Sequence, residues 1–230
     1  MTYFELSDIS FRFAEGKGDV LHNFSMRLNK GEVVGVLGQS GGGKSTLLRI
    51  IAGLEVPNSG NISINGRTLV DRKQFVLPEK RGIGMIFQDY ALFPHLTVAQ
   101  NILFGLHRLS RKERLQRLEE MLELIQLQDF RKRFPHELSG GQQQRVAFAR
   151  SLAPEPELLL MDEPFSSLDA DLKHSIREEL KRMLRTANMT CILVTHDKED
   201  AAVICDRVVH IANIGHALNI NPKFVSNSTR

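Results

Sequence analysis

The sequence predicts an α/β fold in which a parallel sheet is joined by an antiparallel β lobe and a helical insertion. Three observations predict it. In the first third of the chain, apolar and polar residues alternate in short runs, which is the pattern of strands. Residues 96–153 have the spacing of amphipathic helices. After them, apolar strands alternate with helical stretches, as expected for a parallel sheet.

The clearest hairpin lies in the predicted β lobe. Residues 61–64 and 67–70 have strand patterns, and Asn65-Gly66 lies between them. Asn-Gly accepts the positive φ angles of a type I′ turn. We therefore predict that these two strands pair directly.

A strand, a glycine-rich loop and a helix follow one another in the first fifty residues. Residues 32–37 form an apolar, β-rich run, and residues 44–52 have helical spacing. Gly53 then marks the predicted end of the helix. A glycine-rich loop between a strand and a helix is the structural context of a phosphate-binding motif.

The helical insertion contains a recognisable helix start. Ser110 and Glu113 have the spacing of a capping box, in which each satisfies a backbone N–H at the other's position. The apolar residues that follow are predicted to share one helix face: Leu115, Leu118, Leu122 and Ile125.

The last third of the chain predicts the parallel sheet. Residues 158–160 are all leucine and read as a strand buried on both faces, and residues 190–194 and 207–211 repeat the pattern. The segments 169–187 and 198–205 between these strands have helical spacing.

Composition bounds the function before any motif is considered. The chain has 230 residues, 42% of them hydrophobic and 25% charged, with a net charge of +3, which predicts one globular unit and no nucleic-acid-binding face. Cys191 and Cys205 lack metal-ligand spacing and lie in apolar stretches, so we expect reduced, packed thiols. The start of the chain has no secretory signal pattern, and no apolar run approaches the roughly 20 residues of a membrane span.

The loop after residues 32–37 matches a phosphate-binding motif. Its glycines allow backbone N–H groups to converge on phosphate oxygens, and the following helix N-terminus adds positive potential. The alternative is a glycine-rich turn that only caps a helix, but the strand before and helix after are the context that supports the motif. Lys44 is expected to bridge the β- and γ-phosphates and Ser45 to bind Mg²⁺. The predicted ATP-binding residues here are Gly38, Gln39, Ser40, Gly41, Gly42, Gly43, Lys44, Ser45 and Thr46.

Two carboxylates end the leucine-rich strand. Asp162 is placed to hold Mg²⁺, and Glu163 is placed to polarise an attacking water. A solvated acidic strand end is the alternative, but a phosphate loop requires a second group for its metal. Together the two motifs predict a nucleoside triphosphate site with Mg²⁺.

These motifs alone leave GTPases, kinases, helicases and ATP-driven transporters open. The run LSGGQQQRVAFAR, with MDEPFSSLDADL after it and VTHDKEDA around residue 196, resembles the ATP-binding cassette (ABC) family. The resemblance extends from about residue 3 to residue 212 and implies the ABC ATPase fold on a P-loop NTPase core. The signature residues are Ser139, Gly140, Gly141 and Gln142.

The signature opens a predicted helix. Ser139 and Gln142 have capping-box spacing, and the free N–H groups of the helix N-terminus make an anion site. The resemblance implies that this site binds the γ-phosphate of ATP held by a partner. It therefore implies a homodimer, or a pair of ATPase subunits, that sandwiches two ATP molecules.

The resemblance also assigns roles outside these motifs. Gln88 corresponds to the glutamine that touches Mg²⁺ and the attacking water, and His196 to the switch histidine that contacts the γ-phosphate. Asp169 corresponds to the D-loop residue that crosses to the opposing site, and it is also a good N-cap for the following helix. Phe13 matches the aromatic that stacks on adenine, although Phe11 is predicted on the same strand face and either can serve.

The resemblance further implies a domain layout and a partner. We expect a single ABC domain over 1–230, with a RecA-like core and β lobe in 1–88 and 154–220 and a helical subdomain in about 89–153. Residues 90–109 are where we expect a transmembrane permease to dock. The chain would then work with that permease and a solute-binding protein, as a peripheral subunit on the cytoplasmic side of the cell (inner) membrane.

The run around the signature looks closest to subunits of ferric iron importers, with polyamine, sulfate, sugar and thiamine importers as alternatives. Such iron and sugar proteins usually carry a C-terminal regulatory domain of β-strands, and this sequence ends where it would begin, so we expect a short or truncated member. Less favoured hypotheses are a soluble ABC ATPase that acts on nucleic acid or ribosomes, and an inactive ATP-binding regulator.

Overall fold

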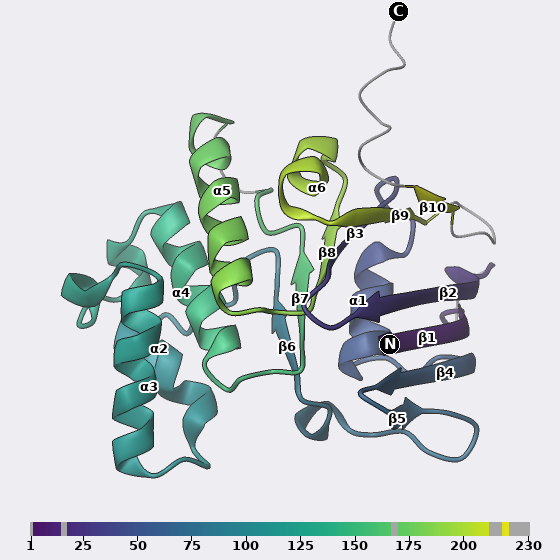
Figure 1. Ribbon diagram of the computed structural model, residues 1–230, viewed down its shortest axis with the longest axis horizontal. Coiled ribbons are helices and arrows are strands. Elements are labelled where there is room, and N and C mark those ends of the chain that lie inside the picture. The colour runs from purple at the N-terminus through teal and green to yellow at the C-terminus, as the bar shows by residue number, and fades with distance from the viewer. Residues whose placement is uncertain (1, 15–17, 167–169, 212–217, 221–230) are drawn as a thin grey trace, which may run out of the picture.

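The computed structural model describes residues 2–14, 18–166, 170–211 and 218–220. Within them, Figure 1 shows a central sheet with helices α2, α3 and α4 gathered on one side and the strands of a second sheet on the other. None of the helices in the described ranges is long and apolar enough to cross a bilayer.

The antiparallel β lobe has four strands in the order β2-β1-β4-β5. Its predicted hairpin is confirmed: Asn65 and Gly66 have φ angles of 48° and 76°, and Ile64 pairs with Arg67. The strands are β1 (Thr2–Phe11), β2 (Leu21–Asn29), β4 (Ser59–Ile64) and β5 (Arg67–Val70).

The central sheet has the order β10-β9-β3-β8-β7-β6, and all neighbouring pairs are parallel except β10 with β9. The parallel strands predicted from apolar runs are therefore confirmed. The strands are β3 (Val33–Leu37), β6 (Ile83–Ile86), β7 (Leu158–Asp162), β8 (Cys191–Thr195), β9 (Arg207–His210) and β10 (Leu218–Ile220).

Six α-helices and four short 3-10 helices complete the described chain. The predicted capping box at Ser110 is confirmed, but Leu115 is 47% exposed and does not share the buried face with Leu118 and Leu122. The helices are α1 (Lys44–Ala52), α2 (Val98–Leu103), α3 (Arg111–Leu124), α4 (Gly140–Leu152), α5 (Ala170–Thr186) and α6 (Lys198–Ile204), with η1 (Pro78–Lys80), η2 (Phe104–Leu106), η3 (Gln128–Phe130) and η4 (Pro135–Glu137).

The central sheet is buried on both faces because its strands divide their side chains between two cores. Leu158 and Leu160 pack with α1 and the β lobe, whereas Leu159 and Met161 pack with the helices on the other side. This alternation explains why the strand is an uninterrupted apolar run. Cys191 belongs to the helical core and is fully buried as a free thiol, as predicted.

Candidate functional site

The predicted phosphate loop joins β3 to α1 at the carboxyl edge of the parallel sheet. Gly41 and Gly43 have φ angles of 77° and 83°, a region that suits glycine. A Cβ on Gly43 would lie 2.8 Å from the Val20 carbonyl oxygen, so a side chain has no room there. No acidic residue occupies the first turn of α1 and no side chain caps it, which leaves its N-terminal amides available to an anion.

Lys44 is held inside this loop. It is 5% exposed, and its ammonium donates hydrogen bonds of 2.9 Å to the carbonyl oxygens of Gly38 and Gln39. The ammonium also lies 3.9 Å from Glu163 Oε1. The loop therefore presents a buried cation beside the amides of the helix N-terminus.

Ser45 and Asp162 come together from different elements. The Ser45 hydroxyl, in the first turn of α1, donates to Asp162 Oδ1 at the end of β7 over 2.9 Å. Burial, and to a smaller extent the charge of Glu163, raises the pKa of Asp162, while the Ser45 hydrogen bond opposes the rise. A carboxylate that is costly to keep charged is suited to a cation that would stabilise it.

Glu163 and His196 form a second contact at the same edge. Glu163 follows β7, His196 follows β8, and His196 Nδ1 lies 2.9 Å from Glu163 Oε2. Glu163 has a φ of 44°, and its N–H donates to the Val194 carbonyl at 2.9 Å. Left-handed backbone at a residue other than glycine is costly and concentrates at functional positions. The histidine side chain is 60% exposed and the glutamate 19%, so the pair is reached from solvent on the imidazole side.

Gln88, which follows β6, lines the same region. A hollow of about 600 Å³ is bounded by Ser45, Gln88 and Asp162 together with Arg49, Phe87, Asp89 and Ser166. Hydroxyl, amide and carboxylate oxygens are hard donors of the kind that Mg²⁺ prefers, so these three side chains fit the predicted metal. No cluster of three or more His, Cys, Asp or Glu that could hold a metal occurs among the described residues, so Mg²⁺ would rely on this mixed set.

Replacing Asp162 should stabilise the fold and weaken Mg²⁺-dependent hydrolysis. A carboxyl whose folded pKa lies above its unfolded value favours folding when protonated, and that contribution is lost as the pH rises through the folded pKa. We expect Asp162→Asn to raise the melting temperature at neutral pH without metal, and to remove part of the decline in stability above pH 3.8, the ordinary value. Mg²⁺-dependent nucleotide hydrolysis should fall at least about a hundredfold.

Thermal unfolding of the two proteins across pH, with and without Mg²⁺, checks this prediction. Asp71→Asn is a matched control because Asp71 lies in a surface turn, where it accepts hydrogen bonds from the Lys73 and Gln74 amides. Unchanged Mg²⁺ dependence in Asp162→Asn would contradict the metal assignment.

The signature residues open α4, as predicted. Ser139 caps the helix by accepting from the Gln142 amide at 3.3 Å, and the Gln142 side chain accepts from the Ser139 amide at 2.9 Å. Ser139 and Gly140 are exposed, whereas Gly141 is buried. Helix α4 packs against α2, α3 and β6, while the phosphate loop begins α1, which packs on β6, β7 and β8.

The two phenylalanines proposed for adenine differ in exposure. Strand β1 ends at Phe11, which is 5% exposed, and Phe13 lies beyond the strand at 45% exposed, so the two do not share a strand face. Their rings meet edge to face with centroids 4.9 Å apart. Phe13 therefore offers the surface for stacking, and Phe11 supports it from the core. Asp169 lies outside the described residues.

Sequence patterns did not predict that Arg150 anchors the loop next to Gln88. Tyr90 and Ala91 have φ angles of 60° and 46°, and the Arg150 guanidinium, on α4, donates to both carbonyl oxygens at 3.0 and 2.6 Å. Arg150 also lies 5.4 Å from the Phe93 ring. The helix that begins with the signature thus holds the loop that follows Gln88. No periodicity indicates such a contact, because it depends on backbone carbonyls of a distant loop.

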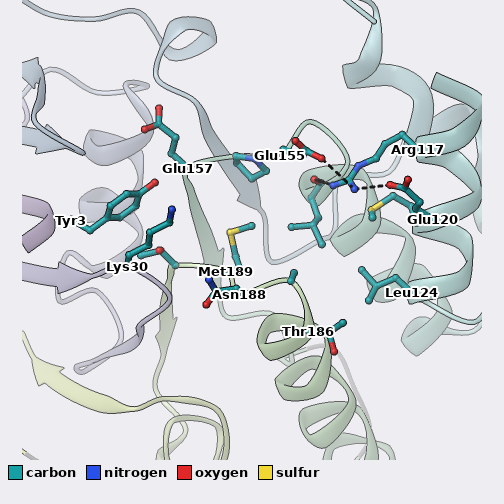
Figure 2. Close-up of a pocket in the computed structure, with 15 residues that line it drawn as sticks. Tyr3, Lys30, Arg117, Glu120, Leu124, Glu155, Glu157, Thr186, Asn188 and Met189 are labelled. Atoms are coloured by element: carbon teal, nitrogen blue, oxygen red, sulfur yellow. Dashed lines mark hydrogen bonds and ion pairs between the residues drawn. The ribbon is translucent and has the colours of Figure 1, made fainter. Parts of the chain in front are cut away.

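A second hollow, of about 430 Å³, lies at the opposite edge of the sheet, where β7 and β8 begin. Figure 2 shows Arg117 between Glu120 and Glu155, with Tyr3 and Lys30 across the hollow. Arg117 lies 2.9 Å from Glu120 and 3.4 Å from Glu155, so its charge is already neutralised. None of the predicted site residues lines this hollow.

The chain is similar in sequence to transport ATP-binding proteins. The putrescine transport ATP-binding protein PotG of Escherichia coli K12 is 50% identical over 198 residues, which is 85% of this chain and 51% of that protein. The Fe(3+) ions import ATP-binding protein FbpC of Escherichia coli O157:H7 is 41% identical over 220 residues, which is 95% of this chain and 61% of that protein. The chain thus spans about half to three fifths of the length of these relatives.

Solved structures support the same fold. The cbiO1 component of a Clostridium perfringens ABC transporter complex superposes with a TM-score of 0.87 at 30% identity, covering 98% of this chain and 91% of that one. A dimeric ATP-binding cassette in a post-hydrolysis state with ADP and Pi gives a TM-score of 0.77 at 32% identity, covering 94% and 98%.

A glycine-rich loop between a buried strand and a helix, with two carboxylates at the end of a nearby parallel strand, defines the P-loop nucleotide-binding class. Residues 21–166 match the family described as ABC transporter, and this match covers more than half of the chain. The chain belongs to the ABC transporter family, and its fold is the ABC ATPase fold.

Proposed function

We propose that this chain is the ATP-hydrolysing subunit of an ABC importer and works as a dimer. The observation that carries the proposal is the convergence of Lys44, the Ser45–Asp162 pair and the Glu163–His196 pair on one edge of the sheet. Lys44 and Ser45 begin α1 after β3, Asp162 and Glu163 lie at the end of β7, and His196 follows β8. Such convergence supplies a cation, metal ligands and a base for phosphoryl transfer to water.

In the proposed reaction, the loop amides and Lys44 bind the triphosphate, and Glu163 accepts a proton from the attacking water. The bond between the γ-phosphorus and the bridging oxygen breaks, giving ADP and phosphate. His196, 2.9 Å from Glu163, is placed to orient that carboxylate and to reach the γ-phosphate. Bound Mg²⁺ would neutralise charge on the β- and γ-phosphate oxygens, held by Ser45, Asp162 and Gln88.

The dimer is proposed because the signature and the phosphate loop begin two different helices of the chain. Ser139 and Gly140 are exposed at the start of α4, while the chain's own phosphate loop lies at the start of α1. A second copy that faces the first would bring each exposed helix N-terminus to the other's γ-phosphate. The similar ATP-binding cassette that was solved as a dimer with ADP and Pi supports the proposal of a dimer. Asp169 would cross to the opposing site.

The permease is proposed to dock on residues 90–109 of the helical subdomain. Phe104 is 57% exposed there, and its ring centroid lies 4.3 Å from that of Phe93. Arg150 holds the start of this segment at Tyr90 and Ala91. An exposed phenylalanine backed by a half-buried one on an anchored loop suits a partner that brings apolar surface from the membrane. The subunit would therefore lie on the cytoplasmic face of the membrane.

The proposed cargo is ferric iron, a polyamine or sulfate, since the relatives include import or transport proteins named for each. The test is uptake of radiolabelled ferric iron, spermidine and sulfate by cells that carry Glu163→Gln at this locus. We expect uptake of one solute to fall to background and the other two to persist. Glu119→Gln is a matched control, because Glu119 is 55% exposed and pairs with Arg131 on the surface.

Each outcome assigns the cargo differently. Loss of ferric iron uptake alone supports our first prediction, and loss of spermidine or sulfate uptake alone moves the assignment to that solute. If all three persist while the purified chain hydrolyses ATP, the cargo lies elsewhere, with sugars and thiamine next. A chain that instead co-purifies with RNA and leaves all uptake intact would contradict the transport function.

A further inference from the structure

An ionic network centred on a buried arginine lies next to His196, and its carboxylates range from the buried Asp200 to the exposed Glu199. Arg177, on α5, is only 5% exposed, and its guanidinium contacts three carboxylates that follow β8. It lies 2.7 Å from Asp197, 2.9 Å from Glu199 and 2.6 Å from Asp200. The proposed reaction uses none of these four residues. Burying a cation and its partners costs desolvation free energy, so such a network is weak evidence for a role in stability and suggests another role.

The network fixes the residues on both sides of His196. Thr195 Oγ1 donates to Asp200 Oδ2 at 2.8 Å and accepts from the Asp197 amide at 3.0 Å. Asp197 caps α6 by accepting from the Glu199 amide at 2.8 Å. The side chains before and after the histidine are thus both tied into the network.

The histidine side chain makes its own contact outside the network. His196 Nδ1 meets Glu163 at 2.9 Å and is 60% exposed, whereas its two neighbours hydrogen-bond within the network. Side chains of consecutive residues in extended backbone alternate between sides. Anchoring positions 195 and 197 therefore fixes where the imidazole of position 196 can lie.

We propose that Arg177 is a positioning residue that holds His196 against Glu163. Arginine suits this role because its planar guanidinium donates to several carboxylates in fixed directions, and lysine offers one ammonium only. In Arg177→Lys the charge remains, but the three contacts to residues 197, 199 and 200 are not all made. The loop then samples positions in which His196 is away from Glu163.

A double-mutant cycle tests this role, which rests on the proposed ATPase function. Mg-ATP hydrolysis is measured for the wild-type protein, Arg177→Lys, His196→Ala and the double variant. We expect Arg177→Lys to lower kcat about tenfold with little change in KM, and to have no further effect when His196 is already alanine. A merely structural loss would lower the rate by the same factor in both backgrounds, and that result would overturn the proposal.

Amide hydrogen exchange on the full chain without nucleotide tests the positioning itself. Arg177→Lys should speed exchange at Asp197 and Glu199, whose amides bond within the network, and leave α1 unchanged. Arg185→Lys is the control, because Arg185 is on the same helix but is 49% exposed and pairs with Asp206. Exchange at both amides equal to wild type would refute the proposal even if the chain hydrolysed no ATP, whereas faster exchange without hydrolysis would refute only the ATPase function.

Discussion

Glu163→Gln should lower the rate of ATP hydrolysis by about 10²–10⁴-fold, the range typical of losing a general base. Glutamine keeps the shape of the side chain but accepts no proton from water at neutral pH. Lys44 remains bound to the loop carbonyls of Gly38 and Gln39, and the Ser45–Asp162 pair does not involve the changed carboxylate. Binding of ATP should therefore change little, and KM should stay within about threefold.

The same variant should also reveal the dimer. If hydrolysis separates the two copies, the chain with Mg-ATP bound and no base should accumulate as a dimer, which light scattering after size-exclusion chromatography measures. Glu119→Gln on the surface of α3 should behave as wild type in both measurements. Hydrolysis by Glu163→Gln at the wild-type rate would assign the base elsewhere, and a monomer under all conditions would contradict the sandwich.

Sequence patterns predicted the helices and strands where a short run of residues is enough to show the backbone or burial requirement. The Asn65-Gly66 turn requires positive φ, and the run at β7 is apolar throughout because both faces are covered. Leu115 shows the limit of this reasoning. Its helical spacing predicts a buried face, but the packing partners of α3 decide which positions are covered, and they leave it 47% exposed.

The candidate site was predictable in its residue types and not in its geometry. Motif spacing placed Asp162 and Glu163 at the end of one strand and Lys44 after the loop that follows another, because parallel strands bring their carboxyl ends to one edge. The left-handed backbone of Glu163 and its 2.9 Å contact with His196 depend on residues 33 positions apart. Arg177 belongs to a helix with many charged residues, so no sequence pattern distinguishes it from a solvated surface arginine.

Arg81 is the second residue whose replacement should have a large effect, and this effect is on stability. It is fully buried beside the end of α1, and it donates to the carbonyl oxygens of Ile50 and Ile51 in that helix and of Val76 after β5, at 2.7–2.9 Å. Burial lowers its pKa to about 10, which reflects the cost of keeping this cation away from water. Its guanidinium also lies 4.7 Å from the Phe75 ring.

Arg81→Met should lower the free energy of unfolding by about 3 kcal/mol. It removes the guanidinium donor from two carbonyls at the end of α1, Ile50 and Ile51, and from the Val76 carbonyl. The Ile50 carbonyl still accepts from the Gly53 amide, whereas a buried carbonyl left without a donor costs about 1–3 kcal/mol, and relief of the buried charge offsets part of the loss. The melting temperature should fall by roughly 6–12 °C. Arg67→Met is a suitable control, since Arg67 is an exposed arginine that donates to the nearby Lys80 and Arg81 carbonyls. A loss below about 1 kcal/mol would mean that the three hydrogen bonds do not outweigh the cost of the charge.

A variant of Gly53 tests whether the close packing of Arg81 contributes to stability, because a side chain at position 53 would occupy space that Arg81 fills. The φ of Gly53 is 88°, and a Cβ there would lie 2.5 Å from Arg81 Nε. Gly53→Ala should therefore destabilise the protein by about 3 kcal/mol, through backbone strain and this overlap. In Gly53→Ala/Arg81→Met the overlap is gone, so the double variant should lose less unfolding free energy than the sum of the two single losses. If the two losses of unfolding free energy are instead fully additive in denaturant unfolding, Gly53→Ala destabilises through backbone strain alone. The close contact with Arg81 would then contribute nothing to the effect.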